Sequence, residues 1–204
     1  MDDFQCYLFD VDGTLANTTD LISTAIIKTI KEKKGENIRK REIDKTSHLS
    51  PKKILKQFGI DDLKAYWKFY DRNIHLASLF FPETKKILIK LKSRNIHLGI
   101  VSSLPKSRLN KILNHLSILD LFEVLVGWQF TVPRKPSPHP IILALKEVGI
   151  SNSKSMYLGD TEEDVIAAKR AGVYSVCVGW SKMKNIEKFN SDIIINHLDE
   201  LLNF

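Results

Sequence analysis

The hydrophobic and polar positions follow one pattern before Pro82 and another after it. Residues 4–10 are an apolar run that stops at acidic residues and a glycine, which is typical of a buried strand followed by a turn. From Thr19 to about Asn73 the apolar residues recur every three or four positions, which predicts helices. These helices are expected at about residues 19–35, 51–59 and 61–73.

Short polar residues mark the start of two of these helices. Thr18, Thr19 and Asp20 offer side-chain oxygens that can cap the first helix. Ser50 is followed by Pro51, and proline is favoured at the first position of a helix. The segment before Pro82 is therefore predicted to be all helical after its first strand.

After Pro82, short apolar runs alternate with helical patterns. The predicted strands are residues 96–101, 123–126, 155–158, 174–178 and 193–195. The predicted helices are residues 83–95, 106–116, 140–148 and 164–171, and a short last helix. Such alternation is typical of a parallel sheet with helices on both faces. We expect an α/β fold with a doubly wound, parallel-sheet, Rossmann-like core (1–16 and 84–204) and an all-helical insert (17–83).

The composition fits a protein of the cytoplasm with a hydrophobic core. The chain has 204 residues, of which 43% are hydrophobic, and this suits one domain with a smaller insert. No apolar run approaches the roughly 20 residues that span a bilayer, and the start MDDFQ is unlike a secretory signal. We therefore expect no membrane partner. Cys6 and Cys177 lie in apolar runs, which favours buried, reduced thiols.

The chain has a net charge of +7, and residues 31–42, KEKKGENIRKRE, gather most of a strong positive cluster. A cluster of this kind is usually a solvated helix end, and the alternatives are a funnel for an anionic substrate or a nucleic-acid contact. The segment contains Glu32, Glu36 and Glu42 and lacks interleaved aromatic residues for base stacking. We therefore expect no nucleic-acid partner. The sequence makes no prediction of the oligomeric state.

Two acidic residues end the first predicted strand. Parallel α/β sheets bind ligands at the carboxyl ends of their strands, which is where Asp10 and Asp12 stand. The two-residue period places both on one side, with Val11 pointing away. Neighbouring carboxylates repel unless a proton or a cation stabilises them. Magnesium does so well, because it prefers carboxylate, water and phosphate oxygens.

Further strand ends offer groups that would complete a phosphate site. Ser102 and Ser103 follow the second strand and bring hydroxyls and backbone N–H groups that can bind phosphate oxygens. Asp160 follows the fourth strand and Asp164 comes one helical turn later, so both offer carboxylates for a metal. Lys135 lies in the proline-rich loop PRKPSPHP, where it can neutralise a phosphoryl group.

These segments resemble the signature motifs of the haloacid dehalogenase superfamily of phosphohydrolases. The motifs, in the family's order, are DVDGTL (10–15), VSS (101–103), Lys135–Pro136 and GDTEED (159–164). The insert stands where the phosphoglycolate phosphatase-like branch has a small helical cap. Ser103 and Leu104 replace the Asn and Lys that this branch commonly has, and Glu83 replaces its usual glycine.

The resemblance implies a role for each of these residues. Asp10 would attack phosphorus and form an aspartyl-phosphate, and Asp12 would protonate the leaving alcohol and later activate water. Mg²⁺ would bind Asp10, the backbone carbonyl of Asp12, and Asp160. Asp164 would support that metal shell or Lys135. The residues that bind the phosphoryl group would be Ser102, Ser103 and Lys135.

The resemblance implies a magnesium-dependent phosphatase of small phosphate monoesters, with a phosphoglycolate-like metabolite favoured. The alternatives are a nucleoside monophosphate phosphatase, or a non-catalytic phosphoryl-ligand binding or scaffold protein that kept the fold. Asp12 disfavours a dehalogenase, which has no leaving alcohol to protonate. Ile22 stands where a β-phosphoglucomutase-like enzyme would have histidine. In the cap, His48 and Arg41 are candidates for reading the substrate.

Overall fold

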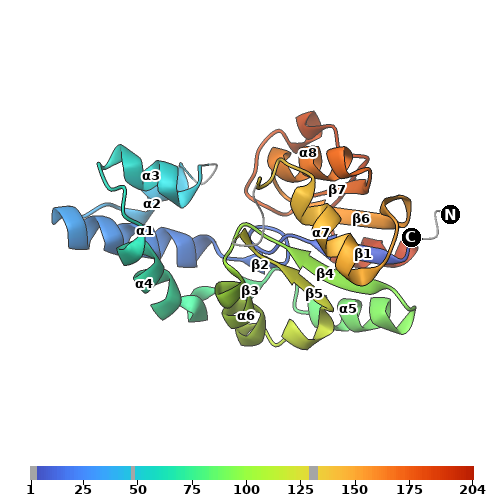
Figure 1. Ribbon diagram of the computed structural model, residues 1–204. Helices are drawn as coiled ribbons and strands as arrows, with labels where there is room; N and C mark the ends of the chain where they lie inside the picture. The colour runs from blue at the N-terminus through green and yellow to red at the C-terminus, as the bar shows by residue number, and fades with distance from the viewer. Residues whose placement is uncertain (1–3, 47–48, 129–132) are drawn as a thin grey trace. The chain divides into compact units, whose positions relative to one another are not determined.

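The computed structural model describes residues 4–46, 49–128 and 133–204. The chain divides into two compact units, one formed by residues up to Ala16 together with Leu79–Phe204, the other by Asn17–Ser78 (Figure 1). Each unit has its own hydrophobic interior and is described separately below. Two short strands, β2 (Ala16–Asn17) and β3 (Ser78–Leu79), pair with each other where the chain passes between the units.

The larger unit is built on a parallel six-stranded sheet with the order β5-β4-β1-β6-β7-β8. Its strands are β1 (Cys6–Phe9), β4 (His97–Val101), β5 (Val124–Val126), β6 (Ser155–Gly159), β7 (Tyr174–Val178) and β8 (Ile193–Ile195). From β1 the chain adds strands first on one side and then on the other. The predicted doubly wound α/β core is confirmed, and the loops after β1, β4 and β6 meet at one edge.

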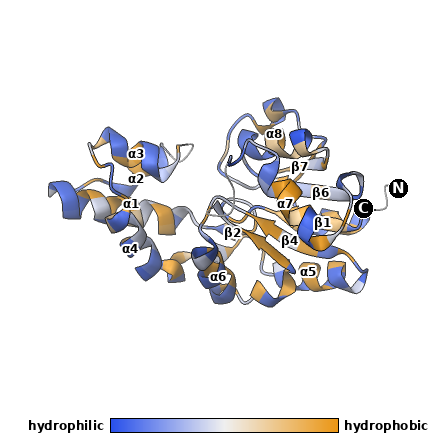
Figure 2. Ribbon diagram, viewed as in Figure 1, coloured by the Kyte–Doolittle hydropathy of each residue, from blue (hydrophilic) through white to orange (hydrophobic). Residues whose placement is uncertain are grey.

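Helices of this unit bury apolar faces against the sheet. They are α5 (Thr84–Ser93), α6 (Lys106–His115), α7 (His139–Val148) and α8 (Glu162–Ala171). The apolar side chains of α7 and α8 form one core cluster with β1, β4, β5 and β6. Figure 2 shows β4 and α7 largely in the hydrophobic colour. Short 3₁₀ segments occur at Leu119–Leu121, Asn152–Lys154, Ile186–Phe189 and Leu198–Asn203.

The smaller unit is all helical in its described part apart from the β2 and β3 residues at its ends. Its elements are α1 (Thr19–Lys34), α2 (Lys40–Asp44), α3 (Pro51–Gln57), α4 (Lys64–Arg72) and the 3₁₀ turn Ile74–Leu76. Helix α1 packs against α4, α2 and α3. Its interior includes Ile26, Ile30, Leu55 and the rings of Tyr66 and Tyr70. That residues 17–83 act as a cap stays a prediction.

The ends of two helices test the predicted caps. Ser50 caps α3 as expected, because its hydroxyl accepts a hydrogen bond from the backbone N–H of Lys53 at 3.4 Å. At the start of α1 the expectation was wrong, since the Thr18 side chain makes no cap bond. The carboxamide oxygen of Asn17 instead accepts from the backbone N–H of Thr19 at 3.3 Å. An amide one position earlier therefore takes the place of the predicted hydroxyl.

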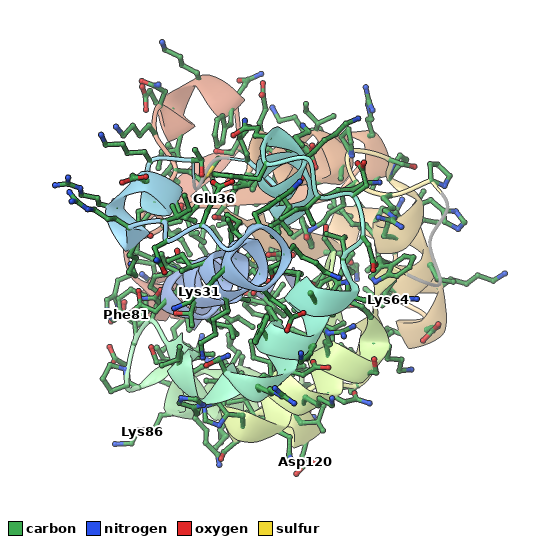
Figure 3. The ribbon with its side chains drawn as sticks, turned by 90° about the vertical axis from the view of Figure 1, so that its left-hand side faces the viewer. Lys31, Glu36, Lys64, Phe81, Lys86 and Asp120 are labelled. Atoms are coloured by element: carbon green, nitrogen blue, oxygen red, sulfur yellow. The ribbon has the colours of Figure 1, made fainter. Side chains whose placement is uncertain are left out.

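The basic segment 31–42 covers the end of α1 and the start of α2, and most of its side chains are exposed. Figure 3 labels Lys31 and Glu36 on this part of the chain. Lys40 forms ion pairs with Asp20 at 3.1 Å and with Asp44 at 2.7 Å, so neighbouring acids offset part of the positive charge. Exposed pairs of this kind contribute little stability.

Cys6 and Cys177 are buried and unpaired with each other, as expected. Burial raises the pKa of each thiol to about 12, and Glu123 adds to this for Cys6 and Asp160 for Cys177. Among the helices of the described ranges, none has the length and hydrophobicity that a bilayer crossing requires.

Candidate active site

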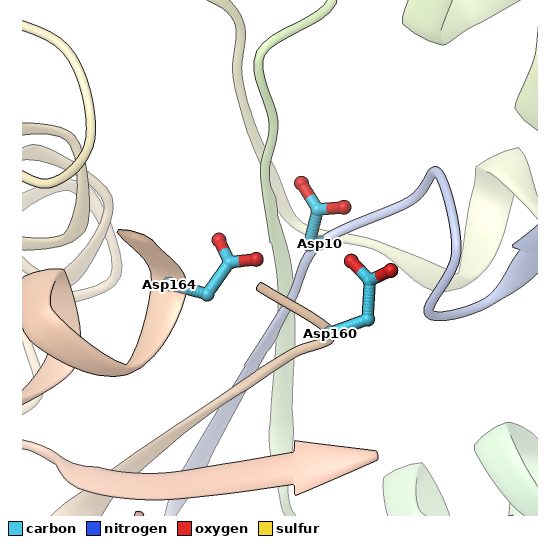
Figure 4. Close-up of side chains that lie close together, drawn as sticks. All are labelled: Asp10, Asp160 and Asp164. Atoms are coloured by element: carbon cyan, nitrogen blue, oxygen red, sulfur yellow. The ribbon is translucent and has the colours of Figure 1, made fainter. Parts of the chain in front are cut away.

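Three carboxylates converge at the edge of the sheet where β1 and β6 end (Figure 4). Asp10 follows β1 and Asp160 follows β6, and these strands are neighbours with Phe9 opposite Leu158. The backbone N–H of Asp10 donates to the carbonyl of Leu158 at 2.8 Å, which continues the pairing beyond β1. Oxygens of Asp10, Asp160 and Asp164 all lie within 4.8 Å of one another. The structure thus brings these predicted residues together.

A tight turn follows Asp10 and passes over Asp160. The carbonyl of Val11 accepts hydrogen bonds from the N–H groups of Leu15 at 3.1 Å and Ala16 at 2.9 Å. Gly13 has a φ of 86°, and a Cβ there would collide with the carboxylate of Asp160. Only glycine fits both this conformation and this approach. The turn leaves Asp12 half-buried two residues after Asp10, while Val11 is fully buried.

Lys135 lies at the centre of the cluster. Its ammonium donates to Asp10 Oδ1 at 2.8 Å, to Asp164 Oδ1 at 2.6 Å and to the hydroxyl of Tyr157 at 2.8 Å. Burial alone would lower the pKa of Lys135, but Asp10 and Asp164 raise it well above its usual range. The ammonium therefore stays charged although its side chain is only 7% exposed.

Asp164 has both carboxylate oxygens occupied. Oδ1 accepts from Lys135 and, at 3.0 Å, from the hydroxyl of Tyr157. Oδ2 accepts from the hydroxyl of Thr161 at 2.6 Å and from its backbone N–H at 3.2 Å. Burial opposes ionisation, but Lys135 and Thr161 outweigh it and lower the pKa of Asp164. Asp164 is thus an ionised group that orients Lys135 and the start of α8.

Asp160 differs from Asp164 because its pKa is raised, not lowered. It is 7% exposed, and within the described ranges no hydrogen bond or ion pair reaches its carboxylate. Burial raises the pKa of Asp160 well above its usual range, and Asp164 and Asp10 raise it further. Burial also raises the pKa of Asp10 to about 7, although Lys135 acts against it. A bound cation would stabilise the ionised forms of Asp10 and Asp160.

The site therefore has the donor set that a hard divalent cation requires. Mg²⁺ binds one or two carboxylates and fills its other positions with water and phosphate oxygens. Asp10 and Asp160 offer carboxylate oxygens close together, whereas those of Asp164 already accept four hydrogen bonds. Asp10 and Asp160 are therefore better placed as metal ligands than Asp164.

The predicted phosphate-binding residues surround one small cavity. It is lined by Val101, Ser102, Ser103, Trp128, Arg134, Lys135 and Pro140. The Ser102 hydroxyl accepts from the backbone N–H of Leu104 at 3.2 Å, before α6 begins. The residue at the N-cap position of α6 is Pro105, so the serine pair does not cap that helix.

Sequence reasoning missed Tyr157 as a member of the site. Its hydroxyl lies between Lys135, Asp164 and the carbonyl of Val101, the last at 2.9 Å. Burial and Asp164 raise the pKa of Tyr157 well above its usual range, so the hydroxyl remains protonated. A tyrosine in an apolar strand has the sequence pattern of a core residue, so no local signal marked it. Of the suggested cap residues, His48 lies outside the described residues and Arg41 is an exposed residue of α2.

Comparison with known proteins shows which family the chain resembles. The family of haloacid dehalogenase-like hydrolases matches the chain over residues 7–178. The phosphoglycolate phosphatase of Aquifex aeolicus is 31% identical over 87% of this chain and 85% of the relative. The pyrophosphatase PpaX of Oceanobacillus iheyensis is 30% identical over 96% of this chain and 94% of the relative.

Solved structures have the same fold. A predicted phosphoglycolate phosphatase from Haemophilus somnus superimposes with a TM-score of 0.84 at 22% identity, covering 100% of this chain and 98% of the other. One from Lactobacillus plantarum has a TM-score of 0.85 at 22% identity, with coverage of 98% and 99%. The chain belongs to the haloacid dehalogenase-like hydrolase family, and it is a phosphatase.

Proposed function

We propose that this phosphatase hydrolyses a small phosphate monoester with the help of Mg²⁺ and through an aspartyl-phosphate formed on Asp10. The observation that carries the proposal is the arrangement of Asp10, Asp160 and Lys135. Two buried carboxylates at adjacent strand ends lie beside a buried lysine that donates to Asp10 at 2.8 Å. A protein that only binds a ligand does not need this charged arrangement, whereas phosphoryl transfer needs it.

Asp10 is the nucleophile in this mechanism. Lys135 holds one carboxylate oxygen, Oδ1, and leaves the other free to approach phosphorus. The positive charge of Lys135 also favours the ionised form of Asp10, which burial disfavours. Attack by carboxylate divides one difficult displacement by water into two easier steps. Asp164 and Tyr157 act by fixing the ammonium of Lys135.

Asp12 is the general acid and base. It follows the nucleophile by two residues, on the turn that Gly13 makes possible. In the first step Asp12 donates a proton to the oxygen of the leaving alcohol. In the second step it accepts a proton from the water that attacks the aspartyl-phosphate of Asp10. A well-placed group of this kind accelerates a reaction by about 10²–10⁴-fold.

The remaining groups bind the phosphoryl oxygens and the metal. Ser102, Ser103 and Lys135 line one cavity and offer hydroxyl, backbone N–H and ammonium donors. Asp10, Asp160 and the backbone carbonyl of Asp12 would hold Mg²⁺. When bound, the ion supplies positive charge that offsets the carboxylates and the phosphoryl group.

The relatives favour a compact substrate, because they include a phosphoglycolate phosphatase and a pyrophosphatase. We place phosphoglycolate-like metabolites first and nucleoside monophosphates after them. Pyrophosphate joins the candidates because a relative 30% identical over 96% of the chain is named a pyrophosphatase. The buried, reduced cysteines support a location in the cytoplasm.

The test is a turnover assay with purified protein and p-nitrophenyl phosphate, with added Mg²⁺ and then with excess chelator. We expect hydrolysis that requires the metal and is abolished in Asp10→Asn. Asp120→Asn is the matched control, because Asp120 is an exposed acid of the same unit. Absence of turnover between pH 5 and 9 would refute the proposal and favour a binding protein. A panel of phosphoglycolate, pyrophosphate and nucleoside monophosphates, ranked by kcat/KM, then identifies the substrate class.

A further inference from the structure

A second cation lies beside Lys135 in the same cavity. Arg134 lines the cavity and lies over the ring of Trp128, with its Cζ 4.3 Å from the ring centroid. Such a cation–π contact holds the plane of the guanidinium while leaving its N–H groups at the edge. The backbone N–H of Trp128 in turn donates to the carbonyl of Leu104 at 3.1 Å. The arginine is thus supported by the loop that follows β4.

The loop that carries Arg134 is also fixed. The backbone N–H of Ser137 donates to the carbonyl of Arg134 at 2.8 Å, which closes a turn around Lys135. Arg170 of α8 donates to the carbonyl of Pro136 at 3.1 Å. The turn therefore presents Arg134 and Lys135 to the cavity from a backbone with several attachments.

The two cations differ in what they already bind. Lys135 donates to Asp10, Asp164 and Tyr157. The side chain of Arg134, by contrast, makes no hydrogen bond and no ion pair with any residue in the described ranges. None of the described residues that line the cavity is acidic, so no side chain among them competes for the guanidinium. Its donors are available to a ligand.

We infer that Arg134 binds a second anionic group of the substrate, a carboxylate or a second phosphoryl group, within a few bonds of the phosphoryl group that is transferred. This rests on the proposed function, since it assumes that Lys135 marks the reacting end of the cavity. Carboxylate and phosphoryl oxygens match the fork of arginine donors, and charge-assisted hydrogen bonds of this kind are strong. A methyl group in that place would accept no hydrogen bond from Arg134.

The experiment compares substrates that differ in charge at one position. 2-Phosphoglycolate carries a carboxylate where ethyl phosphate carries a methyl group, so the ratio of their kcat/KM values isolates the second anion. We expect Arg134→Gln to lower this ratio roughly 10–100-fold, as expected for loss of a charge-assisted hydrogen bond. Arg134→Lys should recover part of it. Lys146→Gln, which removes an exposed charge elsewhere in the unit, should leave the ratio unchanged.

Binding measurements keep the inference testable if turnover fails. In the Asp10→Asn protein with Mg²⁺, calorimetry compares orthophosphate, pyrophosphate and 2-phosphoglycolate, with and without Arg134→Gln. We expect the arginine change to weaken pyrophosphate or phosphoglycolate at least tenfold more than orthophosphate. The larger of these two losses tells whether the second anion is a phosphoryl group or a carboxylate. Equal losses for all ligands mean that the stack on Trp128 is only structural, and no loss refutes the subsite.

A failure of the anion subsite can be distinguished from a failure of the proposed catalysis. If wild-type protein hydrolyses ethyl phosphate with Mg²⁺ and Arg134→Gln leaves the phosphoglycolate ratio unchanged, the proposed function stands and the subsite is wrong. If wild-type protein hydrolyses nothing yet binds pyrophosphate through Arg134, the anion subsite stands and the proposed catalysis is wrong.

Discussion

Replacing Asp160 and Asp164 by asparagine should change the stability of the metal-free protein in opposite directions. Asp164→Asn removes a carboxylate that accepts from Lys135 at 2.6 Å and is 2% exposed. Breaking a buried pair costs about 3–5 kcal/mol, and we expect the lower end because Asp10 still pairs with Lys135. For a chain of this size, 3 kcal/mol lowers Tm by roughly 10 °C.

Asp160→Asn should raise the free energy of unfolding instead. The folded protein disfavours the charge of Asp160, because the group is buried near Asp164 and Asp10 and accepts no hydrogen bond from the described residues. An amide removes that charge at almost the same volume. The measurement is thermal and urea unfolding with chelator present, and Asp120→Asn serves as the control.

The pH dependence of stability follows from the directions in which the pKa values of Asp164 and Asp160 are shifted. The lowered pKa of Asp164 means that its stabilisation is present above the unfolded value, about 3.9, and is lost as the pH falls further. The defect of Asp164→Asn should therefore shrink in acid. The raised pKa of Asp160 means that the wild type loses stability as the pH rises above about 4. The advantage of Asp160→Asn should therefore grow toward neutral pH.

Added Mg²⁺ completes the test. The ion should raise the Tm of the wild type, and Asp160→Asn should lose most of that increase because it loses a proposed ligand. Asp164→Asn should retain more of it, since losses from an outer-shell partner are about 10–100-fold in metal affinity. If Asp164→Asn is the more stable protein and has lost the response to Mg²⁺ while Asp160→Asn keeps it, our reasoning about the two acids is refuted.

Other predictions test the rest of the chain. Asp10→Asn should abolish turnover and any covalent phosphoprotein trapped by acid quenching, whereas Asp12→Asn should slow turnover roughly 10²–10⁴-fold and still bind orthophosphate; near-normal turnover in Asp10→Asn excludes it as nucleophile. Cys6 and Cys177, with pKa values near 12, should resist iodoacetamide at pH 8 until urea unfolds the protein; rapid labelling of native protein would contradict their burial. The basic segment 31–42 should give no gel shift with DNA or RNA at physiological salt, and submicromolar binding with a steep salt dependence would overturn this.

The periodicity of apolar residues was enough to predict the sheet and the longer helices. A parallel strand covered on both faces is a continuous apolar run, and a helix of ten residues repeats its pattern almost three times. Helix α2 was not predicted, because the five residues Lys40–Asp44 form little more than one turn and bury only Ile43. The first cap was missed because Asn17 precedes the three predicted residues, Thr18, Thr19 and Asp20, and all four carry side-chain oxygens.

The site was predictable where residues stand at strand ends, because topology alone brings such positions together. Asp10 and Asp160 fall in this group. Tyr157 does not, since its role depends on which way one side chain points inside the sheet. The stack of Arg134 on Trp128 joins residues six positions apart, and no periodicity relates them. Contacts of this kind depend on loop conformation, which apolar patterns do not encode.

The bond between Lys135 and Asp10 joins residues 125 positions apart in the chain. Closing so long a loop early in folding is entropically costly, and parallel sheets of this kind fold slowly. Tyr157, from β6, reaches both the carbonyl of Val101 at the end of β4 and Asp164 of α8. In a folding intermediate that lacks the strands on either side of β1, Lys135 therefore cannot hold Asp10 in place. Enzymatic activity should thus return only in the last phase of refolding, after the strands on both sides of β1 have docked.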